Sequence, residues 1–97
     1  MKHPNVIFII TDDQGYGDIG YHGNPVLKTP NLDRMARESV QLDNHHHDPL
    51  CSPSRAALMT GRYASRDGVW HVTHGRHLLD PQAMTMAEVF AANGYRT

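Results

Sequence analysis

The chain has 97 residues, of which 39% are hydrophobic, and its 9 basic and 10 acidic residues give a formal net charge of −1. This length allows a single domain with a modest core, and the near-neutral charge gives no argument for binding nucleic acid or an anionic membrane surface. No apolar run approaches the length of a transmembrane helix, and the single cysteine, Cys51, excludes an internal disulfide.

The first predicted element is a strand over residues 5–11. This run is continuously apolar, β-branched and aromatic, which is typical of a strand covered on both faces in a parallel α/β sheet. It ends at Asp12 and Asp13, at the strand end where α/β sheets bind ligands. Adjacent carboxylates repel each other unless a cation compensates, and Ca²⁺ and Mg²⁺ prefer carboxylate oxygens. The pair predicts a divalent-metal site, and the alternative is a solvated loop in which one carboxylate caps the backbone.

The next predicted element is a helix opened by Thr29 as the N-cap and Pro30 at the first position. Its apolar residues share one face, and its charged residues, Asp33 among them, are predicted to face water. A short alternating stretch at residues 40–42 could form a strand. The polar approach that follows includes His45 to His47. Consecutive histidines converge poorly on one ion, so a polar loop is favoured over a metal tract with Cys51.

Two further helices follow in the second half of the chain. The earlier one runs from about Pro53 to Thr60, with Ser52 as its N-cap and Gly61 as its stop. Residues 63–81 show no sustained period and are predicted to be a long loop.

The last helix is opened by Thr85, which forms a capping box with Glu88, and it ends at Asn93 and Gly94. Residues 95–97 then resemble the start of another strand. One strong strand, one weak strand and three helices do not close an α/β domain. The chain is therefore predicted to be the N-terminal part of a larger protein.

The lone cysteine stands in the run Cys51-Ser52-Pro53-Ser54-Arg55, just before a predicted helix start. Free backbone N–H groups and the helix dipole favour negative charge at such a position, and Arg55 adds a fixed cation. A small reactive group facing an anion is the simplest interpretation. The alternatives are a buried structural cysteine and an arginine in a surface ion pair.

Taken together, these motifs resemble the signature of the type I sulfatases. The resemblance rests on residues 51–55 with 58–62, on residues 4–18 ahead of them, on residues 23–25 and 28–33, and on residues 85–89 and 94–97, in the family's order and spacing. It implies an α/β fold of the alkaline phosphatase type, with the N-terminal part of a mixed, mainly parallel sheet flanked by helices. Residues 1–97 would be an incomplete N-terminal portion of the catalytic domain.

The resemblance also implies a function, a sulfuric ester hydrolase acting on a sulfated small molecule or glycan. Cys51 matches the cysteine that a formylglycine-generating or radical sulfatase-maturing enzyme oxidises to formylglycine, whose hydrate is the nucleophile. Arg55 matches the arginine that contacts this group. Asp12, Asp13 and Cys51 match positions at the metal, which is usually Ca²⁺, with Mg²⁺ as the alternative.

Other implied parts are missing from these 97 residues. The family's lysine and histidine for sulfate binding and leaving-group protonation would follow Thr97, and so would its later metal ligands. The chain alone is therefore expected to be inactive. A phosphonate or phosphodiester hydrolase built on the same site is the alternative function. The protein is expected to be periplasmic or secreted if a signal peptide was removed, and cytoplasmic otherwise.

Overall fold

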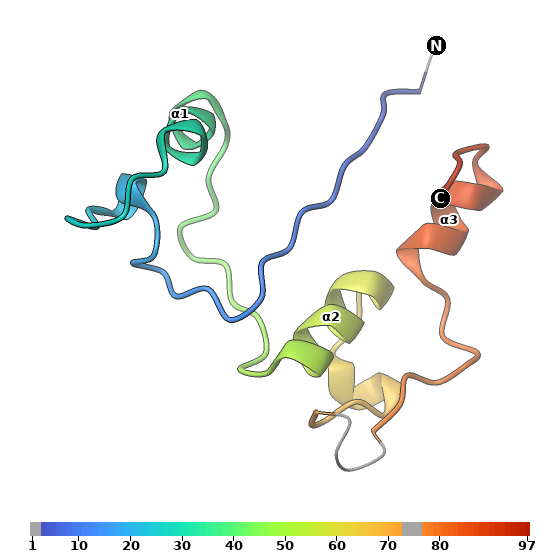
Figure 1. Ribbon diagram of the computed structural model, residues 1–97. Coiled ribbons are helices and arrows are strands. Elements are labelled where there is room, and N and C mark those ends of the chain that lie inside the picture. Colours follow the sequence, from blue (N-terminus) through green and yellow to red (C-terminus); the bar gives the residue numbers. More distant parts are fainter. Residues whose placement is uncertain (1–2, 73–76) are drawn as a thin grey trace. The chain divides into compact units, whose positions relative to one another are not determined.

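The structure, a computed structural model, describes residues 3–72 and 77–97. The chain forms two compact units, one up to Asn44 and one from His45. The first unit contains η1 and α1, and the second contains α2, η2 and α3 (Figure 1). Each helix in the described part of the chain is too short or too polar to cross a membrane.

The predicted strand over residues 5–11 is not formed, and the described residues contain no strand. The segment is an extended, unpaired chain (Figure 1). Ile7 and Ile9 are 83% and 81% exposed, whereas Phe8 and Ile10 are 57% and 47% exposed. This alternation follows from extended geometry, in which successive side chains point to opposite sides. A strand also needs a hydrogen-bonded neighbour, so the predicted sheet stays a prediction here. The shorter strands predicted at 40–42 and 95–97 are likewise not formed among the described residues.

The first unit is built around η1 (Gly20–His22) and α1 (Pro30–Glu38). As predicted, Thr29 is the N-cap of α1 and Pro30 its first residue, a position at which the missing N–H of proline costs nothing. No residue of α1 is buried, and Leu32 and Met35 are 43% and 54% exposed. The predicted apolar face of this helix is therefore largely open to solvent.

The helix α2 (Cys51–Thr60) begins two residues earlier than predicted. Its N-cap is Leu50, in an extended conformation and without a side-chain cap, whereas the predicted N-cap Ser52 lies inside the first turn. Pro53 is tolerated there because the first N–H groups of a helix have no intrahelical acceptor. The helix ends at Gly61, as predicted, with a φ of 67°. Cys51 is therefore the first residue of the helix and does not precede it.

The second unit has a very small core, formed by Ala56 of α2, Ala64 and Val69. Ala64 opens η2 (Ala64–Asp67), which lies within the stretch predicted to be a long loop. The loop prediction is therefore wrong for these four residues, and residues 73–76 of that stretch lie outside the described residues. The turn forms because Ala64 is small enough to be buried against α2, and the Val69 N–H donates to the Ala64 carbonyl at 3.0 Å.

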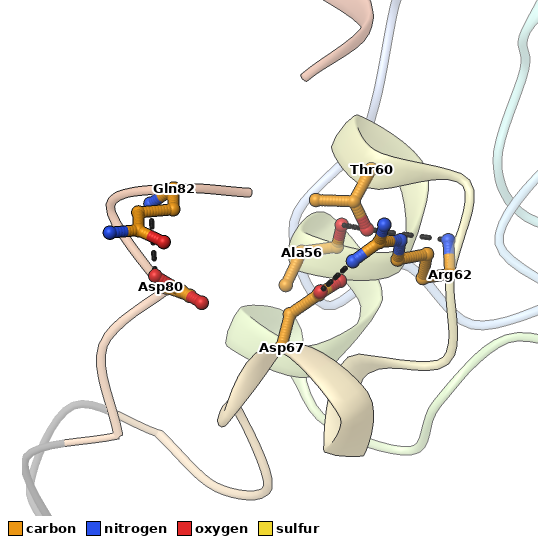
Figure 2. A network of polar contacts seen from close by, with 6 residues as sticks. All are labelled: Ala56, Thr60, Arg62, Asp67, Asp80 and Gln82. Atoms are coloured by element: carbon orange, nitrogen blue, oxygen red, sulfur yellow. Dashed lines mark hydrogen bonds and ion pairs between the residues drawn. The ribbon is translucent and has the colours of Figure 1, made fainter. Parts of the chain in front are cut away.

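Polar contacts link Arg62 to Asp67 of η2 and the Thr60 hydroxyl to the backbone of α2 (Figure 2). The Asp67 side chain is 2% exposed, and its Oδ1 lies 3.3 Å from Nη1 of Arg62, which is 60% exposed. The other carboxylate oxygen of Asp67 has no hydrogen-bond partner among the described residues. The Asp80 N–H donates to the Asp67 carbonyl at 3.2 Å, which ties the far end of the predicted loop to η2.

The last helix, α3 (Met86–Ala92), confirms the predicted capping box. The Glu88 N–H donates to Oγ1 of Thr85 at 3.4 Å, and the Thr85 N–H donates to Oε2 of Glu88 at 2.7 Å. The Thr85 hydroxyl also donates to Oε2 of Glu88, at 2.8 Å. The two hydrogen bonds that this carboxylate accepts, first the one from the Thr85 backbone N–H and then the one from the hydroxyl, lower the pKa of Glu88. The helix ends at Asn93, followed by Gly94 at a φ of 83°. No residue of α3 is buried.

Candidate functional site

Cys51 and Arg55 lie on one exposed face of α2. A helix turns about 100° per residue, so side chains four apart nearly align. Pro53 and Ala56 are buried, and they fall on the opposite face of the helix. Burial of that face fixes the orientation of α2 and turns Cys51 and Arg55 outward, where both are exposed. The structure thus brings the two predicted catalytic residues together on one accessible surface.

The position of Cys51 at the start of α2 has an electrostatic consequence. The first N–H groups of a helix point away from its body without intrahelical acceptors, and the dipole adds positive potential there. Ser54 is the first residue whose N–H enters the helical ladder, donating to the Leu50 carbonyl at 3.1 Å. The N–H groups of Cys51 and Ser52 precede it, and Arg55 supplies a full positive charge. This end of α2 is therefore suited to an anionic group.

The chain leading into α2 is held against its first turn. Oγ of Ser54 donates to the Asp48 carbonyl at 2.6 Å and lies 3.3 Å from Nδ1 of His47. The same ring nitrogen lies 2.5 Å from the Asp48 carbonyl. His47 thus belongs to a polar loop that leads into the helix start at Cys51, in agreement with the polar-loop interpretation of the histidine run.

Asp12 and Asp13 lie in the first unit, immediately after the extended segment. Asp13 has a φ of 49° and is the one described non-glycine residue in the left-handed region. Such a conformation costs about 1–2 kcal/mol per residue, although Asp tolerates it better than most residues. In an extended chain, neighbouring side chains point to opposite sides. The left-handed conformation of Asp13 ends this regular alternation at the acidic pair.

The donor chemistry of this pair fits a divalent cation of the Ca²⁺ or Mg²⁺ type, because both side chains offer hard carboxylate oxygens. Such ions take about six to eight oxygen ligands, more than two carboxylates supply. Within either unit, the described residues hold no group of three His, Cys, Asp or Glu side chains that could bind a metal. The two carboxylates therefore fit as part of a ligand set, and the other ligands would come from elsewhere.

Two acidic residues that the structure makes prominent were not singled out by the sequence. Asp33, predicted to face water, is half-buried and accepts hydrogen bonds from the Tyr21 N–H at 2.8 Å and from the Thr29 hydroxyl at 2.7 Å. Asp67 is the one described charged residue that is buried. Thr29 followed four residues later by Asp33 is a local signal that could have indicated the first contact, whereas nothing local marks Asp67.

A comparison with protein families covers all four candidate site residues. The family model described as Sulfatase matches residues 4–97, which include Asp12, Asp13, Cys51 and Arg55. The chain belongs to the sulfatase family. Membership implies an α/β fold of the alkaline phosphatase type, although the described part of this sulfatase chain contains helices and no strand.

Curated relatives agree with the family assignment. The sulfatase chain is 47% identical to Mus musculus steryl-sulfatase over 107 residues, which cover 99% of the chain and 17% of that protein. It is 48% identical to Homo sapiens N-acetylgalactosamine-6-sulfatase over 81 residues, covering 81% of the chain and 16% of that protein. Mus musculus arylsulfatase J is 48% identical over 70 residues, covering 72% of the chain and 12% of that protein. The chain thus spans less than a fifth of each relative. No solved structure matches it.

Proposed function

We propose that these 97 residues are the N-terminal part of a longer sulfatase that hydrolyses sulfate esters, with the nucleophile derived from Cys51. The observation that carries the proposal is the exposed face of α2, on which Cys51 and Arg55 stand at the positive end of the helix in a chain of the sulfatase family. That end is suited to the tetrahedral, anionic sulfate group.

We propose that Cys51 is oxidised to formylglycine by a maturing enzyme, either of the formylglycine-generating or of the radical type. Exposure of Cys51 supports this, because the thiol is accessible to another protein. One hydroxyl of the formylglycine hydrate would attack sulfur and expel the alcohol of the ester. The second hydroxyl would then lose its proton, so that the aldehyde forms again as sulfate leaves. Cys51 is not a side-chain cap of α2, since the N-cap is Leu50, and its chemical conversion would leave the start of the helix intact.

Arg55 has two tasks in this proposal. Its guanidinium lies one helical turn after position 51, so it can donate hydrogen bonds to oxygens on that residue and on a bound sulfate. Its fixed charge also offsets negative charge that develops as an ester bond breaks. A lysine would keep the charge and lose the planar set of donors. Arg55→Lys should therefore retain only part of the activity that Arg55→Ala loses.

We propose that Asp12 and Asp13 hold a divalent cation, with Ca²⁺ preferred over Mg²⁺. Bound there, the ion supplies positive charge for sulfate oxygens. The two side chains would contribute carboxylate oxygens and, through their negative charge, keep the ion at the site. We expect the substrate to be a sulfated small molecule or glycan, since the relatives include a steryl-sulfatase and an N-acetylgalactosamine-6-sulfatase.

Peptide mass spectrometry of the active, complete protein tests this function. The peptide that carries residue 51 should contain an aldehyde that reacts with a hydrazide probe, and Cys51→Ala should lose both the aldehyde and sulfate-ester turnover. Ser65→Ala, an exposed change later in the same unit, serves as the matched control and should retain both. An unmodified thiol at position 51 in fully active enzyme contradicts the mechanism.

The range of substrates needs its own assay. Turnover of an aryl sulfate should exceed turnover of an aryl phosphodiester and an aryl phosphonate by the same preparation. Faster hydrolysis of either phosphorus ester would instead identify a phosphonate or phosphodiester hydrolase on this site. The 97-residue chain alone should hydrolyse none of them, and Ca²⁺-dependent turnover by it would contradict that prediction.

A further inference from the structure

The carboxylate of Asp33 joins two segments of the first unit. Its Oδ1 accepts a hydrogen bond from the Tyr21 N–H at 2.8 Å and another from Oγ1 of Thr29 at 2.7 Å. Oγ1 of Thr29 in turn accepts from the Gly20 N–H at 2.8 Å. Two consecutive backbone N–H groups of η1 are therefore bound to the first turn of α1. Hydrogen bonds to an ionised carboxylate are about twice as strong as neutral ones.

Contact between the Asp33 carboxylate and η1 is unusually close. A Cβ atom built on Gly20 would lie 2.7 Å from Oδ2 and 3.2 Å from Oδ1 of Asp33. Real Cβ atoms essentially never approach another heavy atom to 2.7 Å, so any larger residue at position 20 would have to displace the Asp33 carboxylate. The Asp33 carboxylate therefore lies directly against the backbone of η1.

The last residue of η1 and a residue just after it reach back to the loop that follows the acidic pair. Nδ1 of His22 lies 2.6 Å from the Tyr16 carbonyl, and the two rings are stacked with centroids 3.8 Å apart. Nδ2 of Asn24 donates to the Gly17 carbonyl at 2.6 Å. Through these contacts η1 and its flank hold residues 16 and 17 in place.

The loop itself is closed by a turn immediately after Asp12 and Asp13. The Asp18 N–H donates to the Gly15 carbonyl at 3.0 Å, and Oδ2 of Asp18 accepts from the Gly15 N–H at 2.7 Å. Only Gln14 separates this turn from Asp13. The contacts therefore run without a gap from Asp33, through η1, to the backbone beside the acidic pair.

We propose that Asp33 is a positioning residue for the cation site, because it holds η1 on α1 and thereby fixes the loop that orients Asp12 and Asp13. This inference rests on the proposed function, in which Asp12 and Asp13 bind a divalent cation. Residues that orient metal ligands from outside the ligand set typically contribute about 10–100-fold to metal affinity. Asp33 belongs to this class.

Calorimetric titration of the complete protein with Ca²⁺ tests the inference without relying on turnover. Asp33→Ala should weaken Ca²⁺ binding by about tenfold or more. Asp33→Asn should stay within about threefold of wild type, because the amide oxygen has two lone pairs and can accept both hydrogen bonds. Glu38→Ala removes the same charge from an exposed position of the same helix and should match wild type.

Further measurements separate positioning from a general loss of structure. Sulfate-ester turnover by Asp33→Ala should recover to within about threefold of wild type when Ca²⁺ is raised to saturation, because only the cation affinity has changed. Unchanged Ca²⁺ affinity in Asp33→Ala overturns the inference. So does an equal loss in Asp33→Asn, or a loss that saturating Ca²⁺ does not restore. Failure of the wild type to bind Ca²⁺, or binding that persists in an Asp12→Asn, Asp13→Asn double variant, overturns the proposed metal site as well.

Discussion

Replacement of Arg62 by alanine should destabilise the second unit more than neutralising the acid that it contacts. Arg62 is 60% exposed, whereas the Asp67 side chain is 2% exposed, and a single contact of 3.3 Å joins Nη1 of Arg62 to Oδ1 of Asp67. Arg62→Ala leaves a carboxylate out of water without its cation. Asp67→Asn leaves a neutral amide in the same volume and lets the guanidinium return to solvent.

The geometry sets the expected magnitudes. Removing one partner of a fully buried ion pair costs about 3–5 kcal/mol. Water already reaches the exposed guanidinium of Arg62, which screens the pair, so Arg62→Ala should cost less, about 2–3 kcal/mol. Asp67→Asn loses the same charge pair and also removes the buried charge, so its net cost should be about 1 kcal/mol or less. When Asp67 is already asparagine, the further change Arg62→Ala should lower the free energy of unfolding by almost nothing.

Amide hydrogen exchange provides a local assay. The N–H groups of Val69 and Asp80 donate to the carbonyls of Ala64 and Asp67, so they report opening of η2. A loss of 2 kcal/mol speeds their exchange by about 30-fold. Arg66→Ala, which removes an exposed arginine from η2 itself, is the control and should have little effect. The reasoning is refuted if Arg62→Ala has no larger effect than Arg66→Ala, or if Asp67→Asn proves the more damaging change.

Three further outcomes are expected. Thr85→Ala removes the side-chain cap of α3 and should cost about 1 kcal/mol, measured as faster amide exchange in α3; unchanged exchange would contradict this. Because the pKa of Glu88 is lowered, its contribution to stability should be complete above the ordinary carboxyl value of 4.5 and lost as the pH falls through the lower folded value; amide chemical shifts of α3 should follow this titration, and Thr85→Ala, which removes the hydroxyl and keeps the backbone N–H, should move it only part of the way back towards the ordinary value. Gly61→Ala places a side chain at a φ of 67° and should cost about 1–2 kcal/mol in urea unfolding, whereas an effect below a few tenths would show that the end of α2 adapts freely.

The helices could be predicted from the sequence because their signals are local. Thr29 and Pro30 mark the start of α1, and Thr85 with Glu88 marks the start of α3. Gly61 marks the end of α2 because a left-handed residue is needed there. Each of these features depends on neighbours within a few residues, so no knowledge of packing is required.

Features that depend on distant parts of the chain were missed. The segment at 5–11 has the composition of a strand, but pairing requires a partner, and no described residue provides it. The turn η2 arises because Ala64 is buried against α2, which no local pattern reports. Asp33 looks like a solvated helical residue until its contact with Tyr21, twelve positions away, is known.

Part of the candidate site followed from the sequence for the same reason. The spacing of four between Cys51 and Arg55 places them on one helical face wherever the helix begins, so the error over the start of α2 did not matter. That this face is the exposed one could not be predicted, because it depends on burial of Pro53 and Ala56 on the other side. The cation site at Asp12 and Asp13 stays a prediction.

The core of the second unit contains two alanines, Ala56 and Ala64, and one larger apolar residue, Val69. Such an interior has almost no side-chain freedom with which to absorb an added atom. Enlarging Ala56 or Ala64 should therefore press η2 and α2 apart and shift α2, the helix that presents Cys51. Natural sequences of this unit should therefore vary widely at exposed positions. At the two buried alanines, even a single added methyl group should be rejected.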